Sequence, residues 1–190
     1  EKELPHITTG PILGRLSALG EGEEAEPFGR LPVSGLAEAA AAQHRGEGVE
    51  LDVIAMPSDG SNAAEPSAPR RAEILHGLGN VIENAVQFCT KHVEVVVTWD
   101  DQLITIEVMD DGPGVAPSVL MRLGEPYVSS RRKSGRMGLG VFIAKTLLER
   151  TGASMSFFNG RQYGARIVIT WPRQELEALS SDQRDVKLNS

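Results

Sequence analysis

The stretch that decides the fold is residues 71–110, which comprise RAEILHGLGNVIENAVQF (71–88), HVEVVVTW (92–99) and LITIEVMD (103–110). The first segment has apolar residues at helical spacing, which predicts one long helix with a buried stripe. In the other two segments apolar and polar residues alternate, as is typical of half-buried strands. Residues 100–102 between these strands indicate a hairpin turn, so we expect antiparallel pairing. The buried stripe of the helix is expected to consist of Ile74, Leu78, Val81, Ile82 and Ala85.

The flanking segments predict the same two kinds of element. On the N-terminal side, residues 36–44 are alanine-rich and predict a helix, and residues 49–55 predict a strand. On the C-terminal side, residues 138–151 predict a helix that begins at glycines, and residues 153–158 and 164–171 predict a second hairpin. Interleaved helices and strands with two hairpins predict an α/β (α+β) two-layer sandwich. Its mixed, largely antiparallel sheet is expected to be covered on one face by helices.

The periphery of the chain has a different composition. Residues 1–32 are rich in Gly, Pro and Glu and predict a linker that carries the frayed end of an upstream helix. Residues 57–69 predict a loop, and residues 173–190 predict a polar C-terminal tail. The domain itself is expected to span residues 33–172. Because the chain begins at Glu1 rather than Met, we expect a fragment or a processed product.

Composition excludes several classes of function. The 190 residues include 19 Lys and Arg against 26 Asp and Glu, a net charge of −7, which disfavours a nucleic-acid partner. The absence of a long apolar run predicts that this segment makes no membrane contact. A single cysteine, Cys89, excludes an internal disulfide and a multi-cysteine zinc site. We interpret it as a small buried hydrophobic residue rather than as a redox site.

The first motif with chemical meaning is a pair of asparagines in the long helix. Asn80 and Asn84 are four residues apart and therefore lie on one helical face. Asparagine is a mediocre helix former, so two in mid-helix call for an explanation. An amide oxygen can ligate a hard cation such as Mg²⁺, but both side chains could also simply cap neighbouring loops.

The second motif follows a strand, where Asp110 and Asp111 precede a turn that contains Gly112 and Gly114. The turn could be an ordinary surface turn. Alternatively, the glycines let the backbone approach a planar ligand closely, and a carboxylate at the strand end could accept a hydrogen bond from an exocyclic amino group. The residues alone leave both interpretations open.

The third motif is Gly138-Leu139-Gly140, which opens a helix. Free N–H groups and the positive helix end make such a place an anion site. The preceding residues 131–136 hold four cations, which could attract a polyphosphate or form a solvated surface. The pattern matches neither a Walker A loop nor a dinucleotide-binding fingerprint.

The order and spacing of these three motifs resemble the Bergerat-fold (GHKL) ATPases and kinases over residues 33–172. This superfamily includes gyrase-type topoisomerases, MutL, large heat-shock chaperones and sensor histidine kinases. The hydrolysing branches have a general-base Glu where this chain has Asn80, so the resemblance favours phosphoryl transfer. HGLGNVIENAVQF, EPYVSSR and MGLGVFIAKTLLER are similar to the RegB/PrrB/ActS group of redox-responsive histidine kinases.

The resemblance implies a role for each matching residue in a Mg·ATP site. Asn84 would ligate Mg²⁺ and Asn80 would line the same phosphate pocket. Asp110 would accept from the adenine amino group. Other residues implied in nucleotide binding are Phe88 beside the nucleotide, Gly112, Gly114 and Val115 in the pocket wall, Tyr127, Arg131, Arg132 and Lys133 in a lid spanning 115–137, and Gly138, Leu139 and Gly140 around the phosphates.

The implied activity is ATP-dependent phosphorylation of a histidine on a separate dimerisation domain, from which a response regulator would receive the phosphoryl group. The implied location is the cytoplasmic part of a membrane-anchored bacterial kinase. Two residues depart from the family pattern. Gln87 stands where many relatives have a Lys or Arg that contacts phosphate, and Arg136 stands where the pattern has a glycine. His6 is not expected to be the acceptor, because too few residues follow it for a helical hairpin. The alternatives are a GHKL-type ATP hydrolase and a non-catalytic nucleotide-binding or docking module.

Overall fold

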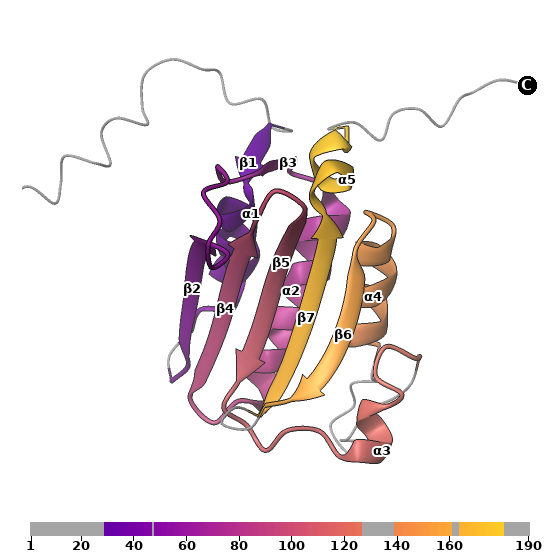
Figure 1. Cartoon of the computed structure of the whole chain (residues 1–190). Coiled ribbons are helices and arrows are strands. Elements are labelled where there is room, and N and C mark those ends of the chain that lie inside the picture. Colours follow the sequence, from indigo (N-terminus) through magenta and orange to yellow (C-terminus); the bar gives the residue numbers. More distant parts are fainter. Residues whose placement is uncertain (1–28, 47, 127–138, 161–163, 181–190) are drawn as a thin grey trace, which may run out of the picture.

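The computed structural model describes residues 29–46, 48–126, 139–160 and 164–180. Its main sheet has five strands in the order β2-β4-β5-β7-β6, and the helices α1, α2 and α4 cover one face of it (Figure 1). The pair β2–β4 is parallel and the other three pairs are antiparallel. This architecture confirms the predicted two-layer sandwich. The elements are β1 Arg30–Pro32, α1 Val33–Ala41, η2 Ala42–His44, β2 Glu50–Pro57, β3 Ser67–Pro69, α2 Ala72–Phe88, β4 His92–Trp99, β5 Leu103–Asp110, α3 Pro117–Leu120, α4 Gly140–Glu149, β6 Ser154–Asn159, β7 Ala165–Pro172 and α5 Arg173–Ala178.

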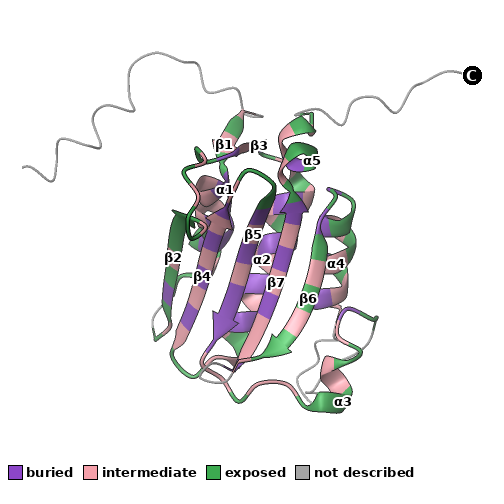
Figure 2. Ribbon diagram, viewed as in Figure 1, coloured by how far each residue is buried: buried purple, intermediate pink, exposed green. Residues whose placement is uncertain are grey.

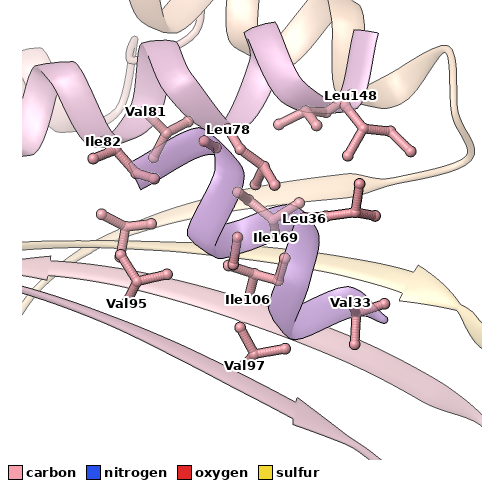
Figure 3. Packing of buried hydrophobic residues seen from close by; sticks show 14 of the residues in the cluster. Val33, Leu36, Leu78, Val81, Ile82, Val95, Val97, Ile106, Leu148 and Ile169 are labelled. Atoms are coloured by element: carbon pink, nitrogen blue, oxygen red, sulfur yellow. The ribbon is translucent and has the colours of Figure 1, made fainter. Parts of the chain in front are cut away.

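The core lies between the sheet and the helices, as Figures 2 and 3 show. All five apolar residues predicted for the α2 stripe are buried. They meet the inward-facing residues of β4 and β5. Burial alternates along all of β4 as predicted, and along β5 as far as Val108, after which Met109 and Asp110 are buried too. Burial of this continuous apolar surface is the main favourable contribution to folding, at about 25 cal/mol per Å². Among the described residues, no helix has both the length and the apolar character that crossing a bilayer requires.

The predicted hairpin between β4 and β5 is present and has a local cause. The Asp100 carboxylate accepts hydrogen bonds from the backbone N–H groups of Gln102 (2.7 Å) and Leu103 (2.8 Å). These bonds close the turn in the way that aspartate side chains commonly do. They also lower the pKa of Asp100 below its ordinary value. Asp110 is the eighth and last residue of β5, so its position is fixed by the register of this hairpin.

The structure differs from the sequence prediction at the margins. Residues 57–69, predicted to be a loop, contain β3, which pairs with β1. The first helix begins at Val33 and ends as a 3-10 turn, and the helix predicted over 138–151 spans Gly140–Glu149. The segment after Pro172 begins with α5, where Leu176 is only 2% exposed. Strands and helices this short contain too few residues for a periodic signal.

Helices α2 and α4 pack closely at Gly77. A Cβ atom at this position would lie 2.6 Å from Cγ of Leu148, a residue that is fully buried. At Gly79 in the same helix, the nearest atom to such a Cβ is 3.6 Å away, in ordinary contact. Gly77 therefore allows α2 and α4 to pack closely, and any larger residue at this position would increase the distance between the two helices.

We predict that Gly77→Ala destabilises the domain by about 1–3 kcal/mol, because the overpacked helices must separate. Gly79→Ala is the matched control and is expected to be neutral or stabilising by up to about 1 kcal/mol, as helix propensity dictates. Urea unfolding of both variants measures the difference. Equal effects at the two positions would contradict the steric explanation, as would a Gly77→Ala/Leu148→Ala double variant whose losses simply add.

Candidate nucleotide-binding site

One cavity lies where α2 ends, β5 runs into its glycine turn and α4 begins. Most of the sequence-predicted site residues in the described part of the chain line it, together with residues of α3, β6 and β7 that the sequence did not single out. Its lining contains both polar and apolar groups, which suits a ligand with a planar ring and a charged part. The lining residues are Asn84, Phe88, Asp110, Gly114, Val115, Val119, Leu120, Leu123, Gly140, Val141, Phe157, Phe158, Ala165, Arg166 and Ile167.

Asp110 is the buried charge of this cavity, with only 3% of its surface exposed. Its Oδ1 atom accepts hydrogen bonds from the N–H groups of Gly112 (2.9 Å) and Ala165 (3.3 Å). Within the described residues, no hydrogen bond is made to Oδ2. One oxygen therefore fixes the carboxylate, and the other can accept a hydrogen bond from a ligand.

Burial raises the pKa of Asp110 above the ordinary value for an aspartate. Hydrogen bonds from Gly112 and Ala165 lower the pKa, and the nearby Asp111 carboxylate raises it, but burial is the largest effect. Asp111 itself lies outside the cavity lining and accepts hydrogen bonds from the N–H groups of Thr90 (2.7 Å) and Lys91 (3.0 Å). The two neighbouring carboxylates thus have different surroundings: Asp110 lines the cavity, whereas Asp111 accepts hydrogen bonds from the turn after α2.

The turn after Asp110 needs glycine for two separate reasons. A Cβ atom at position 112 would overlap the backbone oxygen of Phe88 and lie 2.8 Å from Oδ1 of Asp110. Gly114 has a φ of 74°, in the region that favours glycine. The backbone of this turn consequently approaches both the end of α2 and the cavity more closely than a chain with side chains could.

The two asparagines of α2 face different hollows. Asn84 lines the cavity beside Phe88, whereas Asn80 lines a separate hollow with His44 and His76. Asn84 lies about one turn further along the helix than Asn80, and the two side chains therefore have different neighbours. The described residues thus bring Asn84, but not Asn80, to the cavity, which departs from the expectation of one shared pocket.

Helix α4 begins at the cavity. Gly140 is its first residue and lines the cavity, and Leu139 occupies the N-cap position. Free N–H groups at a helix N-terminus favour an anion, and the prediction of an anion site for these residues rests on that property. The other residues predicted to contact phosphates, Arg131, Arg132, Lys133 and Gly138, lie outside the described residues, as does Tyr127.

The aromatic wall of the cavity was not predicted from the sequence. Phe157 and Phe158 both line it, and Phe158 is 48% exposed with the Arg166 guanidinium 6.0 Å from its ring centroid. Arg166 is held in turn by both carboxylate oxygens of Glu107, each at 2.8 Å. A signal was present, because two adjacent phenylalanines interrupt the alternation that a half-buried strand requires.

Two other residues singled out from the sequence have simple local contacts. The side-chain amide of Gln87 is exposed and donates to Glu83 at 3.1 Å. The Cys89 thiol donates to the backbone oxygen of Val86 at 3.2 Å. Burial, followed by the carboxylates of Asp111 and Asp110, raises the pKa of Cys89, which is opposite to the shift of an activated thiol.

The profile of the family described as histidine kinase-, DNA gyrase B-, and HSP90-like ATPases matches residues 70–175. The chain belongs to this family. It is 38% identical over 165 residues to the sensor histidine kinase RegB of Cereibacter sphaeroides, a match that covers 76% of this chain and 36% of that protein. It is also 32% identical over 99 residues, half of this chain, to the sensor protein RstB of Escherichia coli.

Solved structures show the same fold. The mycobacterial sensor histidine kinase MprB superposes with a TM-score of 0.61 at 17% identity, covering 76% of this chain and 97% of that one. Full-length ShkA, solved in complex with AMPPNP, superposes with a TM-score of 0.60 at 23% identity, covering 82% of this chain and 33% of that one. Within the family, the chain is an ATP-binding catalytic domain of the sensor histidine kinase type. It spans about a third of the length of RegB.

Proposed function

We propose that this domain binds Mg·ATP in the cavity and transfers the γ-phosphoryl group to a histidine on a separate dimerisation domain. The observation that carries the proposal is the buried Asp110, whose Oδ1 is fixed by two N–H groups while Oδ2 is left to accept from a ligand. An exocyclic amino group of adenine supplies the matching donor. The complex of the related ShkA with AMPPNP supports nucleotide binding at this fold.

In the proposed complex the base lies at the Asp110 end. Gly114 and Val115 form one wall there, and Phe88, Phe157 and Phe158 supply apolar surface. The triphosphate lies toward Asn84 and the N-terminus of α4 at Gly140, where the free N–H groups favour negative charge. We also assign phosphate contacts to Asn80, Arg131, Arg132, Lys133 and Gly138. The shape of the site is assigned to Gly112, Leu139 and Tyr127.

The donor set fits magnesium better than a metal that needs several protein ligands. The described residues contain no group of three or more His, Cys, Asp or Glu side chains placed to hold a metal ion. Asn84 supplies one amide oxygen at the cavity wall, and Mg²⁺ characteristically takes its other ligands from phosphates and water. When bound, the ion neutralises phosphate charge. The protein's own contribution is to hold the triphosphate in place, which is the main requirement of phosphoryl transfer.

Transfer rather than hydrolysis is favoured by the residue at position 80. A general base that activates water must accept a proton, and the amide of Asn80 cannot do so at neutral pH. The proposed acceptor is therefore the histidine of a dimerisation helix, and the proposed next recipient is a response regulator. We propose that the parent protein is a membrane-anchored kinase with this domain in the cytoplasm.

The test is a phosphorylation assay with γ-labelled ATP, Mg²⁺ and a separately supplied phosphoacceptor helical hairpin from a related sensor kinase. We expect label on the hairpin histidine, and little release of inorganic phosphate when the hairpin is left out. Steady phosphate release without the hairpin would contradict the kinase function in favour of hydrolysis. Nucleotide binding without any transfer would instead favour a docking module.

A further inference from the structure

We propose that Asn159 is a positioning residue for the nucleotide base, acting through the backbone of Val115. This inference rests on the proposed function. Asn159 is the last residue of β6, and its side-chain amide forms two hydrogen bonds with a single residue 44 positions earlier in the chain. Its Oδ1 accepts from the N–H group of Val115 at 2.9 Å, and its Nδ2 donates to the carbonyl of Val115 at 2.8 Å.

These bonds complete the support of the turn that forms one wall of the cavity. At its beginning, the turn is tied to the β6–β7 hairpin through Asp110, whose carbonyl accepts from the N–H group of Gly164 at 2.5 Å. At its end, Asn159 ties Val115 to the same hairpin. Gly114, between these two attachments, lies against the Asn159 amide, since a Cβ atom there would be 3.0 Å from Oδ1. The turn is thus fixed at both ends.

The same hairpin carries the aromatic side of the cavity. Phe157 and Phe158 directly precede Asn159 in β6, and both line the cavity. Gly114 and Val115 line the same cavity. By joining Val115 to the end of β6, Asn159 sets the separation between the turn and the aromatic wall. That separation determines whether a planar ring can lie between them while its amino group reaches Asp110.

Because of its position, Asn159 is expected to affect nucleotide binding more than the stability of the fold. Its side chain is exposed at the end of an edge strand and does not belong to the hydrophobic core. Loss of solvent-exposed hydrogen bonds has a small effect on folding. A flexible turn, however, must be ordered when the base binds, and that cost reduces affinity directly.

The test compares Asn159→Ala, which removes both bonds, and Asn159→Asp, which keeps an acceptor but loses the donor and places a carboxylate against the Val115 carbonyl. The matched control is Ser156→Ala, an exposed residue on the opposite face of β6. We expect ADP affinity, measured calorimetrically, to fall about 3- to 10-fold in both Asn159 variants and to be unchanged in the control. The KM for ATP rises by a similar factor while kcat is retained, and the Val115 amide resonance shifts in the free protein.

Two results would overturn the inference while the proposed function stands: unchanged ADP affinity in both Asn159 variants, or a loss of affinity matched by an equal loss in the Ser156→Ala control. A fall in kcat with unchanged KM would also overturn it, since positioning of the base acts on binding. Failure of the folded wild-type protein to bind ADP would instead reject the proposed function, and this inference with it.

Discussion

Replacement of Asp110 by asparagine is expected to weaken ADP and ATP binding by about 100-fold or more, while the fold is retained. The new side chain has nearly the same shape, and its oxygen can still accept from the N–H groups of Gly112 and Ala165. Its NH₂ group then takes the place of Oδ2. A donor would therefore face the donor amino group of the adenine, and neither would find a partner.

The same variant is expected to leave stability at neutral pH unchanged or to raise it. Burial raises the pKa of Asp110 in the folded state above its value in the unfolded chain. A raised carboxyl pKa means that the folded state holds the proton more tightly, so this group stabilises the fold at low pH. That contribution is lost as the pH rises through the folded pKa. At neutral pH the buried, ionised carboxylate is a cost that asparagine does not carry.

Calorimetric titration with ADP, together with thermal unfolding across pH 3–8, checks both parts of this expectation. Wild-type binding should weaken as the pH falls through the raised pKa, because protonation can turn the accepting oxygen into a donor. Binding by the variant should show no such dependence on this group. Wild-type affinity in the Asp110→Asn protein would contradict the proposed base contact. A variant much less stable than wild type at neutral pH would show that the carboxylate mainly serves the fold.

The second large effect is expected for Asn84→Ala, which removes the amide oxygen that we assign to Mg²⁺. Phosphoryl transfer is expected to fall by about 100-fold or more, the usual cost of removing one pre-organised polar group from a reacting centre. In binding experiments, Mg²⁺ is expected to strengthen the affinity of the wild-type protein for an unhydrolysable ATP analogue. This strengthening is expected to disappear in the variant, while ADP binding without Mg²⁺ changes little.

Gln87→Ala is the control for Asn84→Ala, because it removes an exposed amide three residues further along the same helix that lies outside the cavity lining. It should keep the Mg²⁺ dependence of the wild type. If Asn84→Ala also keeps that dependence, then Asn84 does not ligate the ion. The assignment would then have to move to another oxygen of the site.

Local pattern in the sequence determined most of the fold. The stripe of α2 and the alternation in β4 and β5 reflect periodicities of 3.6 and 2 residues, which are properties of a segment and its solvent. The Asp110 motif could be placed at the end of a strand for the same reason. Its glycines are required by local backbone geometry and by one close approach, which is one of the two interpretations that the sequence left open.

Only the tertiary structure decided which residues meet around that turn. Asn159 and Ala165 contact residues that are 44 and 55 positions away in the chain, and nothing in their own neighbourhoods predicts it. The structure likewise placed Asn80 and Asn84 in different hollows, because successive turns of α2 pack beside different segments of the chain. The pairing of β1 with β3 could not be predicted from the sequence either. Periodicity records whether a residue is buried, whereas the identity of its partner depends on how distant segments pack, which a single segment does not encode.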